Sequence, residues 1–450
     1  MKWVSKVSSR TMAMGAIALL SAAALQPANA ADLGGDCCSD LEGRIAELEA
    51  TTARKGNRKV SLTITGWVNE EIAFWDDGTQ SDVYVGTSPV QQSRFKFLGK
   101  AKIDKDWSAG YLLEIGVNGN PGGQWDQTGP SSKSATTPDN GLTVRRSSWY
   151  LKNKNYGRIL VGYDALTTYH LLAESDTTMT RKIHHDEAEP DFQAKFFIRD
   201  RSGNFVNAGG STPLRWNDVL RGYNNSTPGN GARRNIVRYD SPTVGGFTAS
   251  AAWGEDDIWD TTLAYMGGFG DFTVNGRAGY GHSTDDSSTP CHTLPTQGDN
   301  GDCSWWGVSG FVQHKPTGMF VLASYGEQID HSRAQYALQP GLVDKTDTTW
   351  LVQAGIEHKW NSLGKTNFFG EYRHDDPGSN LNASGELRTQ GADINFLSAG
   401  AIQYIEAADA MLYLLYQHAD GDLEANLASG LTNVQIDSFQ QVIGGVRIAF

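Results

Sequence analysis

Val442-Ile443-Gly444-Gly445-Val446-Arg447-Ile448-Ala449-Phe450 ends the chain and carries its clearest structural signal. Val442, Val446 and Ile448 fall on one face of an extended segment and Arg447 falls on the other, because successive strand side chains point to opposite sides. An apolar face that alternates with other residue types, and that ends on an aromatic residue, indicates a strand with one side against lipid. The sequence therefore predicts a membrane strand at the C-terminus.

The same period of two recurs upstream, from Val60 onwards. Strands are predicted near residues 60–74, 94–103, 109–117, 142–154, 158–163, 234–241, 246–254, 258–267, 271–282, 304–315, 318–327, 347–360, 365–374, 393–406, 409–420 and 435–450. Tight turns, such as 315–318, alternate with long polar loops predicted at 76–92, 118–141, 283–303 and 375–392. A soluble β-sandwich also has many short strands, but its edges would leave backbone groups unpaired, and no segment here looks like a protected edge. The predicted fold is therefore all-β, a sixteen-stranded antiparallel transmembrane β-barrel over residues 60–450.

Composition agrees with a barrel and excludes other classes. The chain has 450 residues, a net charge of −13 and a mean hydropathy of −0.42. No apolar run of eighteen residues follows the first thirty, which excludes a helical membrane protein. The acidic balance argues against nucleic acid as a partner. No Gly-x-Ser-x-Gly elbow or similar nucleophile motif occurs, so we expect neither enzymatic activity nor a cofactor.

Residues 1–30 have the pattern of a secretory signal peptide. Lys2, Lys6 and Arg10 form the positive start, an apolar run follows over 12–25, and 28–30 (Ala-Asn-Ala) fits the cleavage rule for small residues. The mature chain is therefore predicted to be exported, to a compartment in which disulfides persist.

Residues 31–59 form a separate predicted piece, a short periplasmic helix followed by a polar linker. Cys38, Leu41, Ile45 and Leu48 fall at the a and d positions of a heptad pattern. Two heptads are too few to be stable alone. The segment is either an amphipathic tether that lies on something else or a small coiled coil between subunits.

Residues 164–233 interrupt the strand pattern with about seventy residues that have no sustained period of two, which is too long for a plain connection. Nine acidic and eight basic side chains occur in this segment, and its apolar residues come in small groups. We therefore expect a polar loop that folds into the water-filled interior of the barrel and narrows it.

Several motifs resemble those of the general porins, most closely the alphaproteobacterial type. They are Gly157-Arg158-Ile159-Leu160-Val161-Gly162 before the long segment, Arg238-Tyr239-Asp240-Ser241-Pro242 and Gly245-Gly246-Phe247 after it, the C-terminal residues 446–450, and the helix at 41–49. The long segment departs from the family because it is longer than in the best-known members.

The resemblance implies a homotrimer in the bacterial outer membrane, in contact with its lipids and lipopolysaccharide, and inserted by a barrel-insertion machinery that reads Phe450. It implies a water-filled channel for passive diffusion of ions and small hydrophilic solutes. The alternatives are a substrate-selective outer-membrane channel, an outer-membrane barrel enzyme and a secreted β-rich adhesin.

A diffusion channel needs charged groups at its narrowest point. From the long segment we expect the acidic cluster Asp186, Glu187, Glu189 and Asp191, with Arg181 and Lys182 nearby. From the wall we expect Arg94, Lys96, Lys100, Lys102, Arg234, Arg238 and either Arg145 or Arg146, because the strand phase leaves this last choice open. The plainer interpretation of the acidic cluster is a solvated turn.

Three further patterns complete the sequence predictions. His184-His185-Asp186 has two of the residue types that bind metals, but no third ligand with suitable spacing is visible, so no metal site is predicted. Cys291 and Cys303 lie twelve residues apart in one polar loop and predict a local disulfide. Aromatic residues at strand ends, such as Trp67, Trp149 and Tyr372, suit the girdles at the two membrane surfaces.

Overall fold

The computed structural model describes residues 60–129, 141–209, 212–220, 227–284 and 302–450. The predicted signal peptide (1–30) and the predicted helix and linker (31–59), with the seam of Cys38, Leu41, Ile45 and Leu48, lie outside the described residues. Cys291 lies outside them too, so its pairing with Cys303, which is buried at the start of a strand, stays a prediction.

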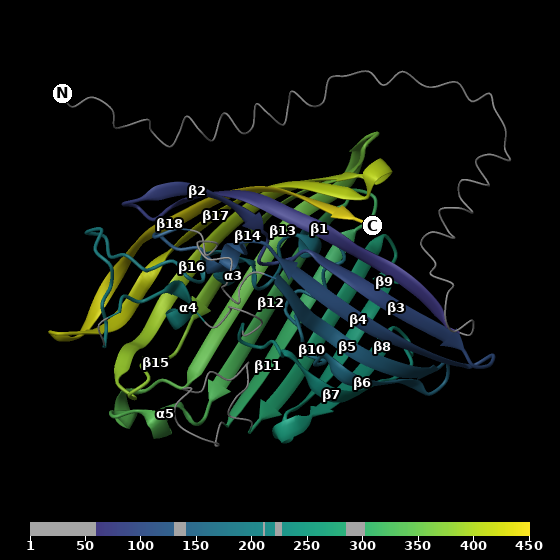
Figure 1. Cartoon of the computed structure of the whole chain (residues 1–450), viewed down its shortest axis with the longest axis horizontal. Helices are drawn as coiled ribbons and strands as arrows, with labels where there is room; N and C mark the ends of the chain where they lie inside the picture. Colours follow the sequence, from purple (N-terminus) through teal and green to yellow (C-terminus); the bar gives the residue numbers. More distant parts are fainter. Residues whose placement is uncertain (1–59, 130–140, 210–211, 221–226, 285–301) are drawn as a thin grey trace. The chain divides into compact units, whose positions relative to one another are not determined.

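The described residues form eighteen strand segments in a single antiparallel sheet (Figure 1). The segments are β1 (Ser61–Asp76), β2 (Ser81–Thr87), β3 (Arg94–Lys102), β4 (Trp107–Asn118), β5 (Gly141–Asn153), β6 (Gly157–Ala165), β7 (Arg233–Asp240), β8 (Phe247–Gly254), β9 (Trp259–Phe269), β10 (Phe272–Ser283), β11 (Cys303–His314), β12 (Met319–Asp330), β13 (Thr346–Asn361), β14 (Gly364–Asp376), β15 (Asn380–Leu381), β16 (Leu387–Ile405), β17 (Ala410–Leu427) and β18 (Gly430–Ala449). β2 and β3 both pair with β1, and β14 and β15 both pair with β16. β2 and β3 are therefore two pieces of one interrupted wall strand, and so are β14 and β15. Counted in this way, the wall has the sixteen strands predicted from the sequence.

The sheet closes on itself through its first and last strands. β1 pairs with β18 from Trp67 opposite Ala449 to Asp76 opposite Gln440. Gly66 and Phe450 complete the seam with two backbone hydrogen bonds, of 3.0 and 3.1 Å between nitrogen and oxygen. The predicted C-terminal strand is thus confirmed, and the sheet formed by the described strands has no free edge.

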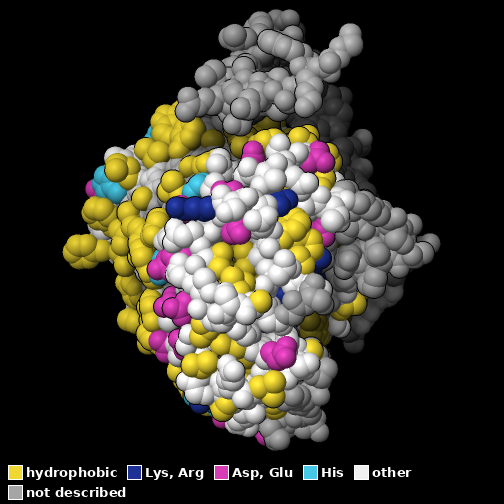
Figure 2. Space-filling view, turned by 90° about the vertical axis from the view of Figure 1, so that its left-hand side faces the viewer, with side chains coloured by type: hydrophobic (Ala, Val, Ile, Leu, Met, Phe, Trp, Pro, Cys, Tyr) yellow, Lys and Arg dark blue, Asp and Glu magenta, His cyan; other side chains and the backbone are white. Residues whose placement is uncertain are grey.

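Side chains alternate across the wall as the period of two predicts. In β13, Trp350 and Val352 are exposed by 36% and 42%, whereas Leu351 and Gln353 between them are 1% exposed. Exposed apolar side chains repeat on neighbouring strands, and Figure 2 shows hydrophobic side chains gathered along one flank of the barrel. An apolar outer surface of this kind matches a lipid-facing belt.

Some strands extend further than their hydrophobic pattern indicates. The sequence predicted that strands end near residues 420 and 435, but β17 and β18 continue to a turn at 428–429. Likewise β2 lies within the predicted loop 76–92, and β15 within 375–392. These extensions contain few apolar residues, such as the exposed Val83 and Val85 of β2 and the buried Leu423 and Ala425 of β17. Such short runs do not give the sustained alternation from which a membrane strand is recognised.

The helices are short, as the bounds of the described elements show: η1 (Gly122–Gln124), η3 (Thr180–Lys182), α3 (Ala188–Gln193), α4 (Trp216–Val219), η4 (Glu255–Asp257), α5 (Arg333–Tyr336), η5 (Pro340–Leu342) and η6 (Glu406–Ala408). Among the described residues, none of the helices has the length and apolar character needed to cross a bilayer.

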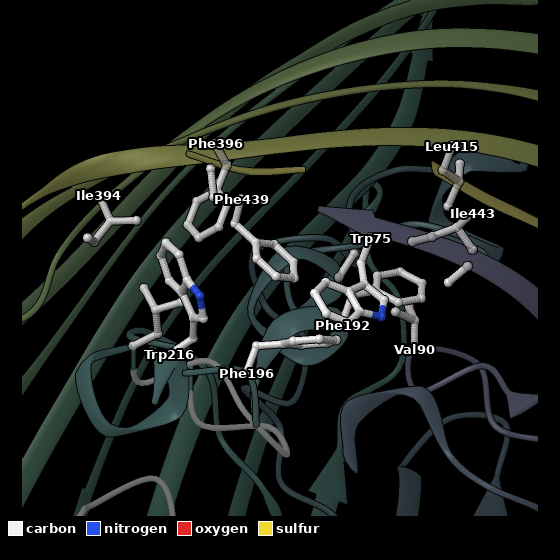
Figure 3. Close-up of a cluster of buried hydrophobic side chains, with 14 of the residues drawn as sticks. Trp75, Val90, Phe192, Phe196, Trp216, Ile394, Phe396, Leu415, Phe439 and Ile443 are labelled. Atoms are coloured by element: carbon white, nitrogen blue, oxygen red, sulfur yellow. The ribbon is translucent and has the colours of Figure 1, made fainter. Parts of the chain in front are cut away.

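The long segment, residues 166–232 between β6 and β7, carries α3 and α4, which Figure 1 draws on the concave side of the strands. Its apolar side chains make a core with one part of the wall (Figure 3). The Phe196 ring lies 4.9 Å from the Trp75 ring and 4.8 Å from the Phe439 ring, and Trp216 lies 6.1 Å from Phe439. The sequence predicted a polar loop with only small apolar groups. In the structure these groups complete a core together with wall residues, which the sequence pattern of the loop alone does not show.

Candidate functional site

The wall carries a cluster of cations around a single carboxylate. Glu114 on β4 lies 2.9 Å from Nη1 of Arg94, 3.4 Å from Nζ of Lys96 and 3.0 Å from Nε of Arg145. Its side chain is only 3% exposed. Because one negative charge is shared among three positive ones, the cluster keeps a net positive charge.

A β-bulge explains how two adjacent arginines both contribute. Across β4 and β5, Glu114 pairs with Arg146 and Ile115 pairs with Val144, so Arg145 is the extra residue of the bulge. A bulge re-aims side chains that would otherwise alternate. Arg145 Nε therefore reaches Glu114, while Arg146 Nε lies 3.5 Å from Oδ1 of Asp164 on β6. The sequence analysis expected one of the two arginines to face inward; the structure turns both toward the interior.

Tyr169 joins the long segment to this cluster. Nη1 of Arg233, the first residue of β7, donates a 2.7 Å hydrogen bond to its hydroxyl. The Arg233 and Arg146 guanidinium groups lie 5.3 and 5.9 Å from the Tyr169 ring centre, within the range of cation–π attraction. Sequence reasoning missed Glu114, Tyr169 and Arg233 as site residues. Glu114 could have been found as the cross-strand partner of Lys96.

The predicted acidic cluster does not occupy the position expected of it. Asp186, Glu187 and Glu189 are 1%, 2% and 0% exposed, and none of them lines a described cavity. Of the four, Asp191 alone does so, in a cavity of about 310 Å³ that Arg145 and Arg233 also line. The expectation that all four carboxylates face the water-filled passage is therefore corrected. The partners of the buried carboxylates come from the long segment itself and from wall strands such as β14 and β16.

Glu189 shows what those partners are. Its Oε1 lies 3.0 Å from Nε2 of His184 and accepts a 2.9 Å hydrogen bond from the Ser398 hydroxyl on β16. His184 Nε2 also lies 3.2 Å from Oε1 of Glu371 on β14, and Arg373 lies 3.8 Å from Glu189. Burial opposes charge on His184, but the two carboxylates outweigh it and raise the pKa of His184 to about 10. Buried charges of both signs thus hold α3 against β14 and β16.

Two larger cavities lie along the basic part of the wall, with volumes of about 600 and 670 Å³. Lys100, Arg158, Arg238 and Arg277 line both cavities. Asp164 and Glu174 are the acidic residues lining the first, and Asp240 is the one lining the second. The open space inside the described part of the barrel is therefore bordered mainly by positive charge.

The remaining predicted residues do not line these cavities. Lys102 is exposed at the end of β3, and Lys182 is exposed on the long segment. Arg181 pairs with Glu174, which Arg277 also approaches at 3.6 Å. Arg234 donates a 2.8 Å hydrogen bond to the carbonyl of Arg233.

Trp67 corrects the prediction of an interfacial aromatic residue. The guanidinium groups of Arg94 and Arg447 and the ammonium group of Lys96 lie 4.6, 4.1 and 4.5 Å from its ring. Its indole N–H donates to the Gln92 carbonyl at 3.1 Å. Trp67 therefore belongs to the inner, cationic face. Trp149 and Tyr372, by contrast, are exposed on the outside, by 53% and 39%.

Comparisons with known proteins agree with this architecture. The family model described as Gram-negative porin matches residues 15–445. Among solved structures, the anion-selective porin from Comamonas acidovorans aligns with 16% identity and a TM-score of 0.53, covering 87% of this chain and 100% of that one. OmpF of Salmonella typhi, in complex with daunomycin, aligns with 14% identity and a TM-score of 0.52, covering 88% and 99%. None of the curated proteins matches the chain. At such identities the structural likeness establishes the fold alone.

Proposed function

The chain belongs to the Gram-negative porin family, and we propose that the channel it forms across the bacterial outer membrane conducts small anions in preference to cations. The family and the fold point to a channel rather than an enzyme. The proposal concerns selectivity, and it rests on the charges of this chain. The anion selectivity named for the Comamonas acidovorans porin belongs to that protein.

The observation that carries the proposal is the charge along the cavities. Lys100, Arg158, Arg238 and Arg277 line both large cavities. Asp240, the acidic residue lining the second, is paired with Arg158 at 2.6 Å and with Arg238 at 2.8 Å. Low-dielectric walls focus the field of such charges into the solvent between them. An entering anion therefore meets a positive potential, although the whole chain carries −13.

The long segment would narrow the channel from the other side. Its apolar side chains pack against Trp75, Phe396 and Phe439, and its carboxylate Glu189 is paired with the buried His184 and Arg373. It therefore takes up volume inside the wall while adding little negative charge to the open space. We propose that solutes pass between the segment and β3 to β10.

Bilayer recording across a salt gradient tests the proposed selectivity. The purified protein should give stepwise conductance and a reversal potential displaced toward the equilibrium potential of the anion. The double variant Arg238→Gln/Arg277→Gln should move that potential toward the cation value. A matched control is Lys359→Gln, since Lys359 is exposed near a turn and pairs with Glu406. Cation preference of the wild-type channel would contradict the proposal.

Assembly is a second part of the proposal. As the family resemblance implies, the chain would form a homotrimer among outer-membrane lipids and lipopolysaccharide, and Phe450 would be read by the insertion machinery. Phe450 is 61% exposed at the end of the closing seam, which supports its role as a signal. Deleting Phe450 should sharply lower the amount in the outer membrane while export continues. Normal outer-membrane levels would contradict this role.

A further inference from the structure

A histidine pair inside the long segment faces one carboxylate oxygen. Nδ1 of His170 lies 3.2 Å from Oδ1 of Asp186, and Nδ1 of His185 lies 3.1 Å from the same oxygen. The two imidazole rings lie 4.4 Å apart. His170 brings a third metal-ligating side chain to the His184-His185-Asp186 pattern, from fifteen residues earlier in the chain than His185.

The hydrogen bonds around His185 leave its inner nitrogen without a proton. Its Nε2 lies 3.4 Å from the Val90 carbonyl, which can only accept, so Nε2 carries the hydrogen. In a neutral imidazole the other ring nitrogen, Nδ1, then carries the single lone pair. The Glu187 amide, 3.4 Å from Nδ1, would have to release that lone pair before Nδ1 could bind a metal. This nitrogen lone pair then faces the carboxylate Oδ1, which is also an acceptor. Two acceptors at 3.1 Å repel each other unless a proton or a metal ion lies between them.

We propose that His170, His185 and Asp186 bind a zinc ion. The ion would link the chain at His170 to the chain at His185 and Asp186. Zinc bonds of about 2.0–2.2 Å in tetrahedral geometry place neighbouring ligand atoms roughly 3.3 Å apart, close to the two distances observed. Metal-bound histidines commonly donate their other N–H to a backbone carbonyl, as His185 does to Val90. Asn230 Nδ2 donates to the other Asp186 oxygen and fixes the carboxylate.

Two further features fit the assignment. The backbone of His170 has φ of +50°, a left-handed conformation that non-glycine residues seldom adopt, and such conformations concentrate at ligand sites. Oε1 of Glu187 lies 3.9 Å from Nδ1 of His170 and is the nearest additional carboxylate oxygen for a fourth ligand. Asp186 has a fully buried side chain while that of His170 keeps 9% exposure, so the ion would enter past His170.

The neighbouring group of His184, Glu189 and Glu371 also has metal-ligating atoms close together. There, however, Arg373 lies 3.8 Å from Glu189, so two cationic groups already balance the two carboxylates. A divalent ion would add repulsion to a satisfied ion network. His184 therefore provides a matched control, since it adjoins the proposed ligands but belongs to the other group.

The test uses the untagged mature protein in detergent, stripped with a chelator and then equilibrated with zinc sulfate. Elemental analysis should find one tightly held zinc per chain in wild type and in His184→Gln. His170→Gln should lower the zinc affinity by more than the roughly 10–100-fold that loss of a ligand's outer partner costs. Absence of zinc from wild type, unchanged binding by His170→Gln, or loss in His184→Gln alone would overturn the assignment.

A spectroscopic measurement on wild type removes the dependence on folding of the variants. Cobalt(II) added to the stripped protein should give the intense visible absorption of a tetrahedral site with nitrogen and oxygen ligands, and zinc should displace it. A weak, octahedral spectrum that zinc does not change would mean that cobalt stays hydrated in solution, and would overturn the proposal.

Discussion

The two sides of the long segment meet different parts of the same barrel wall under opposite physical conditions. Toward β1 and β16 to β18, the rings of Phe196 and Trp216 pack against Trp75 and Phe439 in a dry cluster (Figure 3). Toward β3 to β7, Tyr169 meets the guanidinium groups of Arg146 and Arg233 beside solvent-accessible cavities. One stretch of chain thus serves as a core element on one side and as a channel lining on the other.

This difference between the two sides determines which charges act on a solute. Glu189 is an acidic residue of the segment, but it lies on the dry side and is matched by His184 and Arg373. Arg145 is a wall residue, and it lines a cavity. A charge acts strongly on a passing ion only within about a Debye length of 8–10 Å and when no counter-charge cancels it. Under the proposed function, the wall would therefore contribute more to selectivity than the acidic segment does.

The largest expected effect comes from a substitution in the dry cluster that the long segment forms with β1 and β16 to β18. Phe196→Ala removes a ring that is 0% exposed, and truncation of a buried phenylalanine costs about 3–5 kcal/mol. The long segment should loosen from β18, with faster proteolysis inside residues 166–232 and a larger, noisier conductance. Phe197→Ala is the matched control, because the adjacent ring is half-buried against Phe205 and Arg215. Equal effects of the two variants would contradict the division into a dry and a wet side.

The second prediction uses the buried ion network on the dry side. The pKa of His184 rises from 6.5 to about 10 when the protein folds, because Glu189 and Glu371 outweigh the effect of burial. A raised folded-state pKa stabilises fully below about pH 6.5, and the stabilisation is lost as pH rises toward 10. Attachment of the segment, measured by protease resistance, should therefore weaken between pH 7 and 10.

His184→Gln should flatten that pH dependence, since glutamine does not titrate in this range. His418→Gln is the control, because His418 lies on β17 with a side chain that is 26% exposed. If the wild-type protein keeps the same protease resistance from pH 7 to 10, then His184 is not held as a cation.

The third prediction concerns the wet side. Replacing Arg145 and Arg233 by glutamine removes two positive charges that line the cavity of about 310 Å³. The reversal potential should move toward the cation value, by part of the roughly 59 mV that a tenfold gradient of a monovalent ion allows. Barrel formation, followed by heat-modifiable migration in gels, should be unchanged. An unaltered potential would mean that ions do not pass this cavity.

The smallest expected effect separates two acidic residues four positions apart. Asp191 lines the same cavity as Arg145, whereas Glu187 is 2% exposed behind it. Asp191→Asn should shift the reversal potential slightly further toward anions, and Glu187→Gln should shift it less. A larger shift for Glu187→Gln than for Asp191→Asn in salt-gradient recordings would mean that the acidic cluster of the segment faces the passage after all.

The strands could be predicted from the sequence because lipid on one side and water on the other impose a period of two. The bulge at Arg145 could not, since it depends on how β4 and β5 pair across Glu114 and Ile115. Burial of Glu189 could not either, because Glu371 and Arg373, its partners, lie some 180 residues away in the chain. The charge composition of a segment alone does not predict which wall strand a carboxylate will contact.

The seam between β1 and β18 has a consequence for the order of folding events. Every other neighbouring pair of wall strands is consecutive along the chain, so each can form as a local hairpin or across one loop. The seam joins positions about 380 residues apart, and closing so large a ring costs about 3 kcal/mol more entropy than closing one of ten residues. The hydrogen bonds between Gly66 and Phe450 belong to this seam as well. Closure is therefore a late and slow step, during which both edge strands need an external partner to keep them from pairing with other chains.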